Sequence, residues 1–532
     1  LDFRRVLFRS PNDPIAQSDI RLYQYFATET LPCIYIETEG GIAIDDASLI
    51  NPDEKKGMMN EIPVYNYVGA SISVTDAGDG YDLSKVAAEV KVRGNYTSTY
   101  EKKPIRIKFK KKQKMAGLNN GAALKNWVLL AEYKDSSMLR NSVAAYLGNS
   151  LLEGYGGYAT DFRYVKVYIN NAYHGLYVLA EQQQVNSKRV NVAEPEDPDD
   201  YDLENLSEAD YAKLHDVHFG YLVEYDGYYA QEADLEKFTI NYNRLNHLNG
   251  TSFNPQPSAD NNGGNGGWGG GWGGWNQGWG NTRTIGFSIK NDVYFAEQRD
   301  FIKKCMQTIW NVIYDAIYHP HTDLSTQPYH TMDADGNYVA DTTITGVYEA
   351  VSKVVNVKSL VDMYIIQEIC EDMDISWSSF FFSIDMSPNG DKKLTYTAPW
   401  DFDSSLGSAS GATAANDSLY AMNTDNPWLV VFAGQDWFWK LVNDRFEEAE
   451  QVGVFAGVVR MIDDFTTLYA AAYAENYARW PNSIGRKIES TQVSQVATFR
   501  TQADASAYLK QWLTTRISNL KTLFKTQAGV TE

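Results

Sequence analysis

Hydrophobic and polar residues alternate along the first part of the chain and recur at helical spacing along the second. The alternation predicts strands within 31–38, 70–76, 87–109, 164–182, 218–228 and 285–291, and 164–182 is predicted to be a hairpin with its turn at Asn170–Asn171. Apolar positions three and four apart predict a helix over 136–152, with Asp135 or Ser136 as its N-cap, and further helices from 296 onward. One strand pair near 379–403 interrupts these helices. The pattern therefore predicts an α+β fold with a β-rich first part and a mainly helical second part.

The change of pattern near residue 295 divides the chain. We expect a β-rich part over 31–295 and a helical part over 296–532 that carries the acidic residues, together forming two lobes that share a cleft. Residues 11–30 are predicted to be a linker. "RVLFRS" back-translates to the end of a common sequencing adapter, so residues 1–10 are predicted to be an artefact, with the true start and any signal peptide missing.

Composition excludes several classes of protein. The 532 residues carry a net charge of −21, which argues against general nucleic-acid binding. No apolar run is long enough to span a membrane. The three cysteines are far apart and form no CxxC motif, which argues against structural zinc and a disulfide framework.

A Gly/Trp-rich segment, "NNGGNGGWGGGWGGWNQGWG", occupies residues 261–280. Fixing so many glycines in one conformation costs much entropy, so we favour a flexible surface insertion. The alternative is a binding loop whose tryptophans stack on a glycan or on a partner protein. These tryptophans are Trp268, Trp272, Trp275 and Trp279.

The stretch "TAPWDFDSSLG" (397–407) places Asp401 and Asp403 two positions apart. If the preceding strand continues through them, the two carboxylates share one face, and Trp400 and Phe402 are buried on the other. Neighbouring carboxylates repel unless a cation or hydrogen-bond donors lie between them. Asp403 before "SSLG" is also compatible with a simple Asx-turn.

A second acidic pair, Asp372 and Asp374, borders the preceding strand of the predicted hairpin, which closes at 387–393. The polar ends of the two strands are therefore expected to meet. Carboxylates without histidine favour Mg²⁺ or Mn²⁺ over zinc.

Basic and polar residues of the first part provide a possible phosphate site. Arg93 and Asn95 belong to the glycine turn "RGN", and Lys103 opens the strand "KKPIRIKF". Backbone N–H groups in such a turn, next to a cation, can hold phosphate oxygens. Glu181 ends an apolar strand, where an ion pair with Lys103 would satisfy it. An ordinary turn and a solvated strand end are the alternatives. A phosphate cradle, a Lys–Glu pair and a carboxylate metal site together are the components of phosphoryl transfer.

Several ordered motifs over roughly 31–525 resemble the CotH kinase family, the spore-coat protein H type. The motifs are "KVRGNYTSTYEKKPIRIKF", "NWVLLAEYKDSSMLRN", "YVKVYINNAYHGLYVLAEQ", "GYLVEYD", "FSIK", "YIIQEICEDMDISWSSFFF" and "LTYTAPWDFDSSLG". The resemblance implies an atypical protein-kinase-like fold that uses ATP and Mg²⁺ to phosphorylate Ser or Thr of secreted or coat proteins.

By motif, the resemblance also implies roles for individual residues. Lys103 resembles the lysine that contacts the ATP phosphates, and Glu181 its partner. Asp401 resembles the metal-binding aspartate, with Asp403 beside it. Asp374 resembles the catalytic-loop aspartate, acting as base or as second metal ligand.

Glu224 and Asp226 match a segment near the nucleotide, and Lys290 lies in the family's "iK" strand. Arg140 and Asn141 match an "RN" pair expected to hold the cleft together. At the position where many members have a metal-binding asparagine, this chain has Ser379, a weaker ligand.

Three hypotheses remain open at this point. The first is an active extracytoplasmic or cell-surface protein kinase. The second is a kinase-fold surface protein with weak or no activity that acts in adhesion or assembly, and the third is a carbohydrate-related module. The retained lysine and carboxylates favour the first.

Overall fold

The computed structural model describes residues 20–56, 62–152, 157–255, 285–319, 321–411 and 415–530. The predicted artefact at 1–10 and the Gly/Trp-rich segment at 261–280 lie outside these residues. No described helix is long and apolar enough to cross a membrane.

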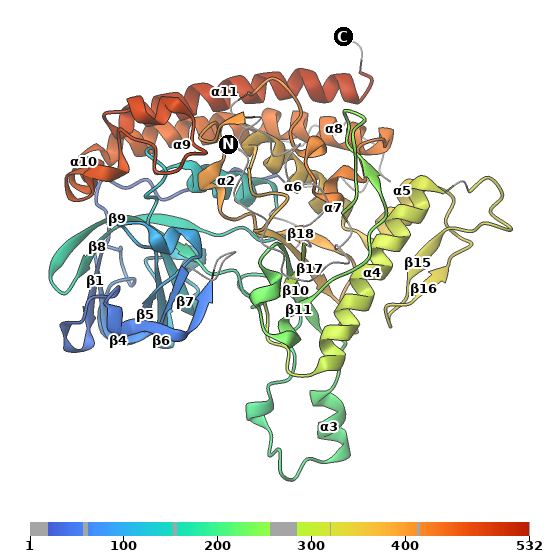
Figure 1. Cartoon of the computed structure of the whole chain (residues 1–532), viewed down its shortest axis with the longest axis horizontal. Coiled ribbons are helices and arrows are strands. Elements are labelled where there is room, and N and C mark those ends of the chain that lie inside the picture. Colours follow the sequence, from blue (N-terminus) through green and yellow to red (C-terminus); the bar gives the residue numbers. More distant parts are fainter. Residues whose placement is uncertain are drawn as a thin grey trace.

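Seven strands of the first part close into a barrel, at the lower left of Figure 1. In order around the barrel they are β1 (Cys33–Thr38), β4 (Val68–Thr75), β5 (Leu83–Val92), β6 (Ile105–Lys114), β7 (Ala123–Leu130), β9 (Ala172–Glu181) and β8 (Phe162–Ile169). All neighbours are antiparallel except β1 and β8, whose parallel pairing closes the barrel. Closure leaves this sheet without an exposed edge.

The barrel interior is apolar because alternate residues of each strand point inward. Its core includes Ile34, Ile36, Ile72, Val74, Val90, Ile105, Ile107, Trp127, Leu129, Val165, Val167, Tyr177 and Leu179. The predicted hairpin turn at Asn170–Asn171 is confirmed, with φ values of 49° and 67° that asparagine tolerates better than most residues.

A second sheet takes strands from both sides of residue 295. Its order is β11 (Lys237–Phe238), β14 (Gly286–Ile289), β10 (Gly220–Asp226), β17 (Phe380–Asp385) and β18 (Thr395–Thr397). Strand β10 pairs with β14 on one side and with β17 on the other. The predicted division at 295 therefore runs through this sheet.

Helices cover the second sheet and one side of the barrel, as Figure 1 shows along its upper edge and right side. They are α2 (Arg140–Leu151), α4 (Ala296–Tyr318), α5 (Val347–Val354), α6 (Val357–Cys370), α7 (Pro427–Val430), α8 (Asp436–Val452), α9 (Val454–Leu468), α10 (Ala470–Arg479) and α11 (Gln502–Gln527). Shorter elements are α1 (Leu118–Gly121), α3 (Glu208–Leu214) and the strand pairs β2 (Ile50–Lys56) with β3 (Ile62–Tyr65), β12 (Leu245–Asn246) with β13 (Ser252–Phe253), and β15 (His330–Met332) with β16 (Tyr338–Ala340). The predicted mixture of helices and strands is confirmed, whereas the barrel is a feature that the sequence pattern did not predict.

Helix α6 lies at the centre of the helical part and is buried on nearly all sides. A helix without a polar face fits only inside a core. Its one aspartate, Asp362, pairs with Arg445 of α8 through two contacts of 2.6 and 3.0 Å, and both side chains are fully buried. The pair ties α6 to α8.

Candidate active site

The stretch that follows β18 differs from the predicted strand. Strand β18 ends at Thr397, Asp401 has a left-handed backbone (φ 68°), and Phe402–Ser404 form a 3₁₀ turn. The interpretation of 401–403 as a strand with Asp401 and Asp403 on one face is therefore wrong. Phe402 is buried as expected, while Trp400 is only half-buried.

Asp374, Asp401 and Asp403 nevertheless converge, as the hairpin of β17 and β18 suggested. Burial raises the pKa of Asp374 to about 6 and that of Asp403 to about 7. Burial followed by the charge of Asp374 raises the pKa of Asp401. No described residue donates a hydrogen bond to the side-chain oxygens of Asp374 or Asp401. These raised pKa values indicate carboxylates that lack enough donors and cations.

Lys134 is the principal cation of this acidic cluster, which we define as Asp374, Asp401, Asp403 and Glu489. Its Nζ lies 3.1 Å from Asp403 Oδ1 and 3.4 Å from Glu489 Oε2, and its side chain is 8 % exposed. Burial opposes the charged form, but the four carboxylates outweigh it and raise the pKa of Lys134. Lys134 is therefore a permanent positive charge within the cluster.

The "RGN" turn reaches the same place from the barrel. The Arg93 guanidinium lies 5.6 Å from the ring centre of Trp400, and its charge offsets part of the rise that burial causes in the pKa of Asp401. Gly94 has a φ of 93°, and a Cβ there would lie 2.2 Å from Thr97 Oγ1, so only glycine fits this turn. Asn95 is exposed and precedes the 3₁₀ turn Tyr96–Thr99. Of the two predicted residues, Arg93 is the one that meets the acidic cluster.

A buried chain of contacts leads from the barrel to the backbone beside Asp401. Asn141 of α2 accepts a hydrogen bond from the Phe402 N–H at 2.7 Å and donates to both carboxylate oxygens of Glu132. Lys102 Nζ donates to the Ala131 carbonyl at 2.7 Å. Burial lowers the pKa of Lys102 to about 7, partly offset by Glu132. Asn141 thus positions the Asp401 loop against the barrel.

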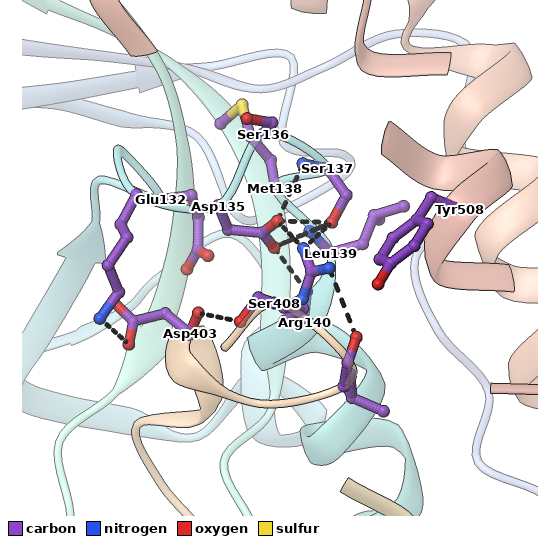
Figure 2. A network of polar contacts seen from close by, with 12 residues as sticks. Glu132, Asp135, Ser136, Ser137, Met138, Leu139, Arg140, Asp403, Ser408 and Tyr508 are labelled. Atoms are coloured by element: carbon purple, nitrogen blue, oxygen red, sulfur yellow. Dashed lines mark hydrogen bonds and ion pairs between the residues drawn. The ribbon is translucent and has the colours of Figure 1, made fainter. Parts of the chain in front are cut away.

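Arg140 fixes the far side of the same loop, as Figure 2 shows. It forms an ion pair with Asp135, and its Nε donates to the Ser405 carbonyl at 3.0 Å. The Ser408 hydroxyl donates to the Asp403 carbonyl at 3.2 Å. The "RN" pair therefore holds the 401–408 segment in place from α2, while its predicted role in holding a cleft together stays a prediction.

The predicted ion pair between Lys103 and Glu181 is wrong. Lys103 Nζ donates to the carbonyls of Ser98 and Tyr100 at 2.8 and 3.0 Å. Glu181 pairs instead with Arg189 at 3.1 Å, and both side chains are almost fully buried.

Lys103 lines a cavity of about 300 Å³ at one end of the barrel. The cavity walls also include Asp45, Glu101, His174, Arg479 and Trp480. None of the four acidic-cluster residues lines this cavity. The predicted phosphate lysine therefore faces a different space from the predicted metal ligands.

Glu224 and Asp226 of β10 do come together with Lys290, which directly follows the neighbouring strand β14. Lys290 Nζ lies 3.1 Å from Glu224, 3.1 Å from Glu232 and 3.9 Å from Asp226. Burial, together with the charge of Glu224, raises the pKa of Asp226 to about 6. We call this group of Glu224, Asp226, Glu232 and Lys290 the Glu224 cluster. Ser379 contacts it, because its N–H donates to Glu224 Oε1 at 2.7 Å. Its predicted role as a metal ligand stays a prediction.

One short segment connects the two clusters. The Trp377 N–H donates to the Asp374 carbonyl at 2.7 Å, and the Trp377 carbonyl accepts from the Gly227 N–H at 2.5 Å. Residues 374–379 thus run from the acidic cluster to the Glu224 cluster. The predicted catalytic and nucleotide-binding residues lie at the two ends of this segment.

The space beside Asp401 is small. A cavity of about 10 Å³ is lined by Asn141, Trp400, Asp401 and residues of β7, β9 and α2. This volume is about that of one water molecule. A nucleotide is far too large for this cavity.

The donor set fits a hard divalent cation in its chemistry. Four carboxylates face Lys134 and Arg93, so negative charge exceeds positive charge, and oxygen ligands of this type suit Mg²⁺ or Mn²⁺. Among the described residues, no three of His, Cys, Asp or Glu already surround a common metal position. Asp401 and Asp403 therefore need to draw together to hold an ion.

Sequence reasoning missed Lys134, Glu132, Lys102 and Glu489. The first two belong to "AEYKDSS", where charged residues directly follow a strand that is apolar at almost every position. Charges at that place are a signal for a buried ion pair. Glu489 lies in a loop far along the chain and carries no local signal.

Comparison with known proteins gives one finding. The family model described as CotH kinase protein matches residues 90–256 and 282–520, more than half of the chain. No curated protein matches it.

Proposed function

The chain belongs to the CotH kinase family, and from that premise we propose that it transfers the γ-phosphate of ATP to a serine or threonine hydroxyl of a protein. The observation that carries the proposal is the acidic cluster around Lys134, at the junction of the barrel and the helical part. An excess of carboxylates over cations costs stability, and a site for a metal and a phosphate explains why it is kept.

In the proposed reaction the acceptor hydroxyl oxygen bonds to the γ-phosphorus while the bond to the β,γ-bridging oxygen breaks. ADP leaves with that electron pair, and the hydroxyl proton passes to a carboxylate. We assign Asp374 as this base, because a pKa of about 6 leaves it ionised at neutral pH but still basic enough to accept a proton.

Asp401 and Asp403 are the residues that would hold Mg²⁺ or Mn²⁺, which when bound neutralises phosphate charge and aligns the transferred group. Lys134 and Arg93 supply fixed positive charge for the phosphates. We propose that Glu224, Asp226 and Lys290 face the rest of the nucleotide. Lys134 takes the role that the sequence suggested for Lys103.

A thermal-shift experiment tests nucleotide binding. ATP with Mg²⁺ is expected to raise the melting temperature of the wild type, and Asp401→Ala is expected to abolish the rise. Asp391→Ala is the matched control, since Asp391 is an exposed aspartate in the turn of the same hairpin and caps only the Lys393 N–H. A wild type that shows no shift would contradict the proposal.

Transfer is measured separately with labelled ATP and a serine-rich acceptor protein. We expect Asp374→Asn to bind ATP with Mg²⁺ but to lose phosphate transfer. Binding without transfer in the wild type would favour a surface protein of weak or no activity that acts in adhesion or assembly. Under either function, the kinase or the adhesion protein, we propose an extracytoplasmic location and a contact through residues 261–280.

A further inference from the structure

The most basic stretch of the chain lies on the outer surface of the barrel. Strand β6 buries Ile105, Ile107 and Phe109 in the barrel core, so the residues between them point outward. The cations along β6 that point outward or are exposed are Arg106, Lys108, Lys110, Lys111, Lys112 and Lys114. We call these residues, together with Lys91 of β5, the basic face. The proposed kinase chemistry does not use them.

Like charges meet on the basic face without carboxylates to balance them. Lys91 lies directly opposite Arg106 in the pairing of β5 with β6, an arrangement that destabilises a sheet. Lys91 and Lys108 hold their ammonium groups 4.8 and 5.9 Å from the ring centre of Tyr67. In the described part of the chain, no cation of the basic face forms an ion pair or a side-chain hydrogen bond with a carboxylate. The buried Nε of Arg106 has no hydrogen-bond partner among these residues.

Protection of a strand edge does not explain these charges. Lysines often guard exposed strand edges against aggregation. Residues 105–108 of β6, however, pair with β5 on one side and with β7 on the other. The basic face is therefore open to a partner that carries negative charge.

The complementary charge occurs on this chain itself, between β9 and β10. Nine of the 17 residues from Glu194 to Asp210 are Asp or Glu, and none is Lys or Arg. We call residues 194–210 the acidic arm. Eight of its nine acidic residues are exposed, and among the described residues only Asp210 has a cation partner, Lys213 at 3.3 Å. Leu203, which is 59 % exposed, lies among these charges and offers an apolar contact.

The acidic arm is fixed at both ends to the second sheet and to α4. At one end the Ala193 carbonyl accepts a hydrogen bond from the Gly220 N–H of β10 at 2.8 Å. At the other end Gln298 of α4 donates to the carbonyls of Leu214 and Asp216 at 3.1 and 3.2 Å. Figure 1 shows the segment between these ends, with α3, projecting from the molecule at the bottom of the view. No hydrogen bond or ion pair between described residues joins the arm to the basic face of its own chain.

We propose that the acidic arm of one copy of this chain binds the basic face of a second copy, so that copies associate head to tail. The two surfaces differ, so a bound pair leaves one arm and one face free, and further copies can add to form a ring or an open chain.

Charge also sets the expected strength of this association. Exposed ion pairs are individually weak, and the net charge of −21 repels one copy from another. Because charges more than about 8 Å apart are largely screened at physiological ionic strength, the close contacts between arm and face act against a weakened repulsion. We therefore expect weak, reversible association that high salt abolishes.

Sedimentation velocity of the full chain, without a purification tag, measures the association. At about 50 mM salt the weight-average mass is expected to rise with protein concentration from the mass of one chain. At about 500 mM salt it is expected to stay at the mass of one chain, because the ion pairs are screened.

Two neutralised variants separate the two surfaces. The face variant carries Lys108→Gln, Lys110→Gln and Lys112→Gln, and the arm variant carries Asp199→Asn, Asp200→Asn and Glu204→Gln. All six side chains are exposed, and none has an ion pair or a side-chain hydrogen bond among the described residues, so both variants are expected to fold. Each variant alone is expected to remain a single chain at low salt. A mixture of the two is expected to form one-to-one pairs and nothing larger, because one intact arm and one intact face remain.

The matched control carries Lys303→Gln, Lys440→Gln and Arg460→Gln, which removes the same charge from exposed positions elsewhere. It is expected to associate like the wild type, and loss of association in the control would overturn the proposal. A wild type with the mass of one chain at every concentration and salt would also overturn it. Association that is lost in the face variant but kept in the arm variant would assign the basic face to another acidic surface and overturn the pairing with the arm. Because the readout is mass, the result does not depend on whether the chain transfers phosphate.

Discussion

Asp135 and Asp403, two carboxylates that Figure 2 draws near Arg140, show opposite chemistry. Asp135 accepts hydrogen bonds from the N–H groups of Ser137, Leu139 and Arg140 and pairs with the Arg140 guanidinium. Burial works against ionisation, yet these donors lower the pKa of Asp135. At Asp403, by contrast, burial raises the pKa to about 7, and the charge of Lys134 offsets only part of this rise.

The difference separates a carboxylate with a structural role from one that we propose to be functional. Asp135 has its donors supplied by the N-terminus of α2, so its charge is used to begin a helix and hold a loop. The acidic cluster has more carboxylates than its cations can neutralise. Such an imbalance is typical of a site where a ligand supplies the missing charge.

The largest effect is expected at Asp135, the carboxylate that has its full set of hydrogen-bond donors. Asp135→Ala leaves the buried Arg140 guanidinium without its carboxylate partner. It also removes the acceptor of three backbone N–H groups, so we expect a loss of about 3–5 kcal/mol in the free energy of unfolding. Urea denaturation measures it. Asp463→Ala is the control, because its pair with Lys510 is exposed and should contribute about 0–1 kcal/mol. Equal effects of the two variants would contradict the comparison.

Lys134→Met should lower the free energy of unfolding by about 2–3 kcal/mol, because it leaves Asp403 and Glu489 without their cation. The double variant Lys134→Met with Asp403→Asn should recover part of this loss, since it removes one of the unpaired charges. The measurement is a double-mutant cycle by denaturant unfolding. Strict additivity would show that Lys134 and Asp403 do not interact.

Acid unfolding sharpens the comparison further. Burial lowers the pKa of His174 to about 4, so the folded state resists its protonation, and stability is lost as pH falls from about 6.5 to 4. His174→Gln should remove about 3 kcal/mol of that loss. The stability that then disappears on further acidification includes the share of Asp135, whose lowered pKa makes its ionised form stabilising. Unchanged pH dependence in His174→Gln would show that this histidine titrates freely.

The smallest effect is expected at Asp401. Asp401→Asn removes one charge from a repelling group, so in the absence of metal the free energy of unfolding should change by no more than about 1 kcal/mol, with stabilisation the expected sign. Denaturation in the presence of a chelator measures it. A loss of several kcal/mol would assign Asp401 to the structural class with Asp135.

Local features were predictable from the sequence. The turn at Asn170–Asn171 was found where the sequence placed it, because turn chemistry acts over a few residues. Helix α2 lies within the predicted 136–152, but it begins at Arg140 with Leu139 as its N-cap, so the prediction of Asp135 or Ser136 as N-cap is wrong. The meeting of Asp374 with Asp401 and Asp403 was also predictable, since one hairpin joins their segments.

Non-local features were not predictable. The parallel pairing of β1 with β8 closes the barrel across more than a hundred residues, and no local pattern encodes it. Lys103 lies two residues before β6 and Glu181 ends β9 of the same barrel, but the pairing of their charges depends on side-chain directions that sequence spacing does not fix. The prediction that β18 continues through Asp401 is wrong because the backbone of Asp401 is left-handed. The surrounding sequence does not indicate this conformation.

Because β10 and β17 pair in one sheet, this sheet can be completed only after the ribosome has synthesised β17. About 150 residues separate the end of β10 from the start of β17, which at ordinary translation speeds is roughly 10–30 s. During that interval β14 can occupy one side of β10, while the other side keeps unpaired N–H and C=O groups that invite association with other chains. Nascent chains halted between these strands should therefore recruit chaperones more strongly than chains halted just after β18.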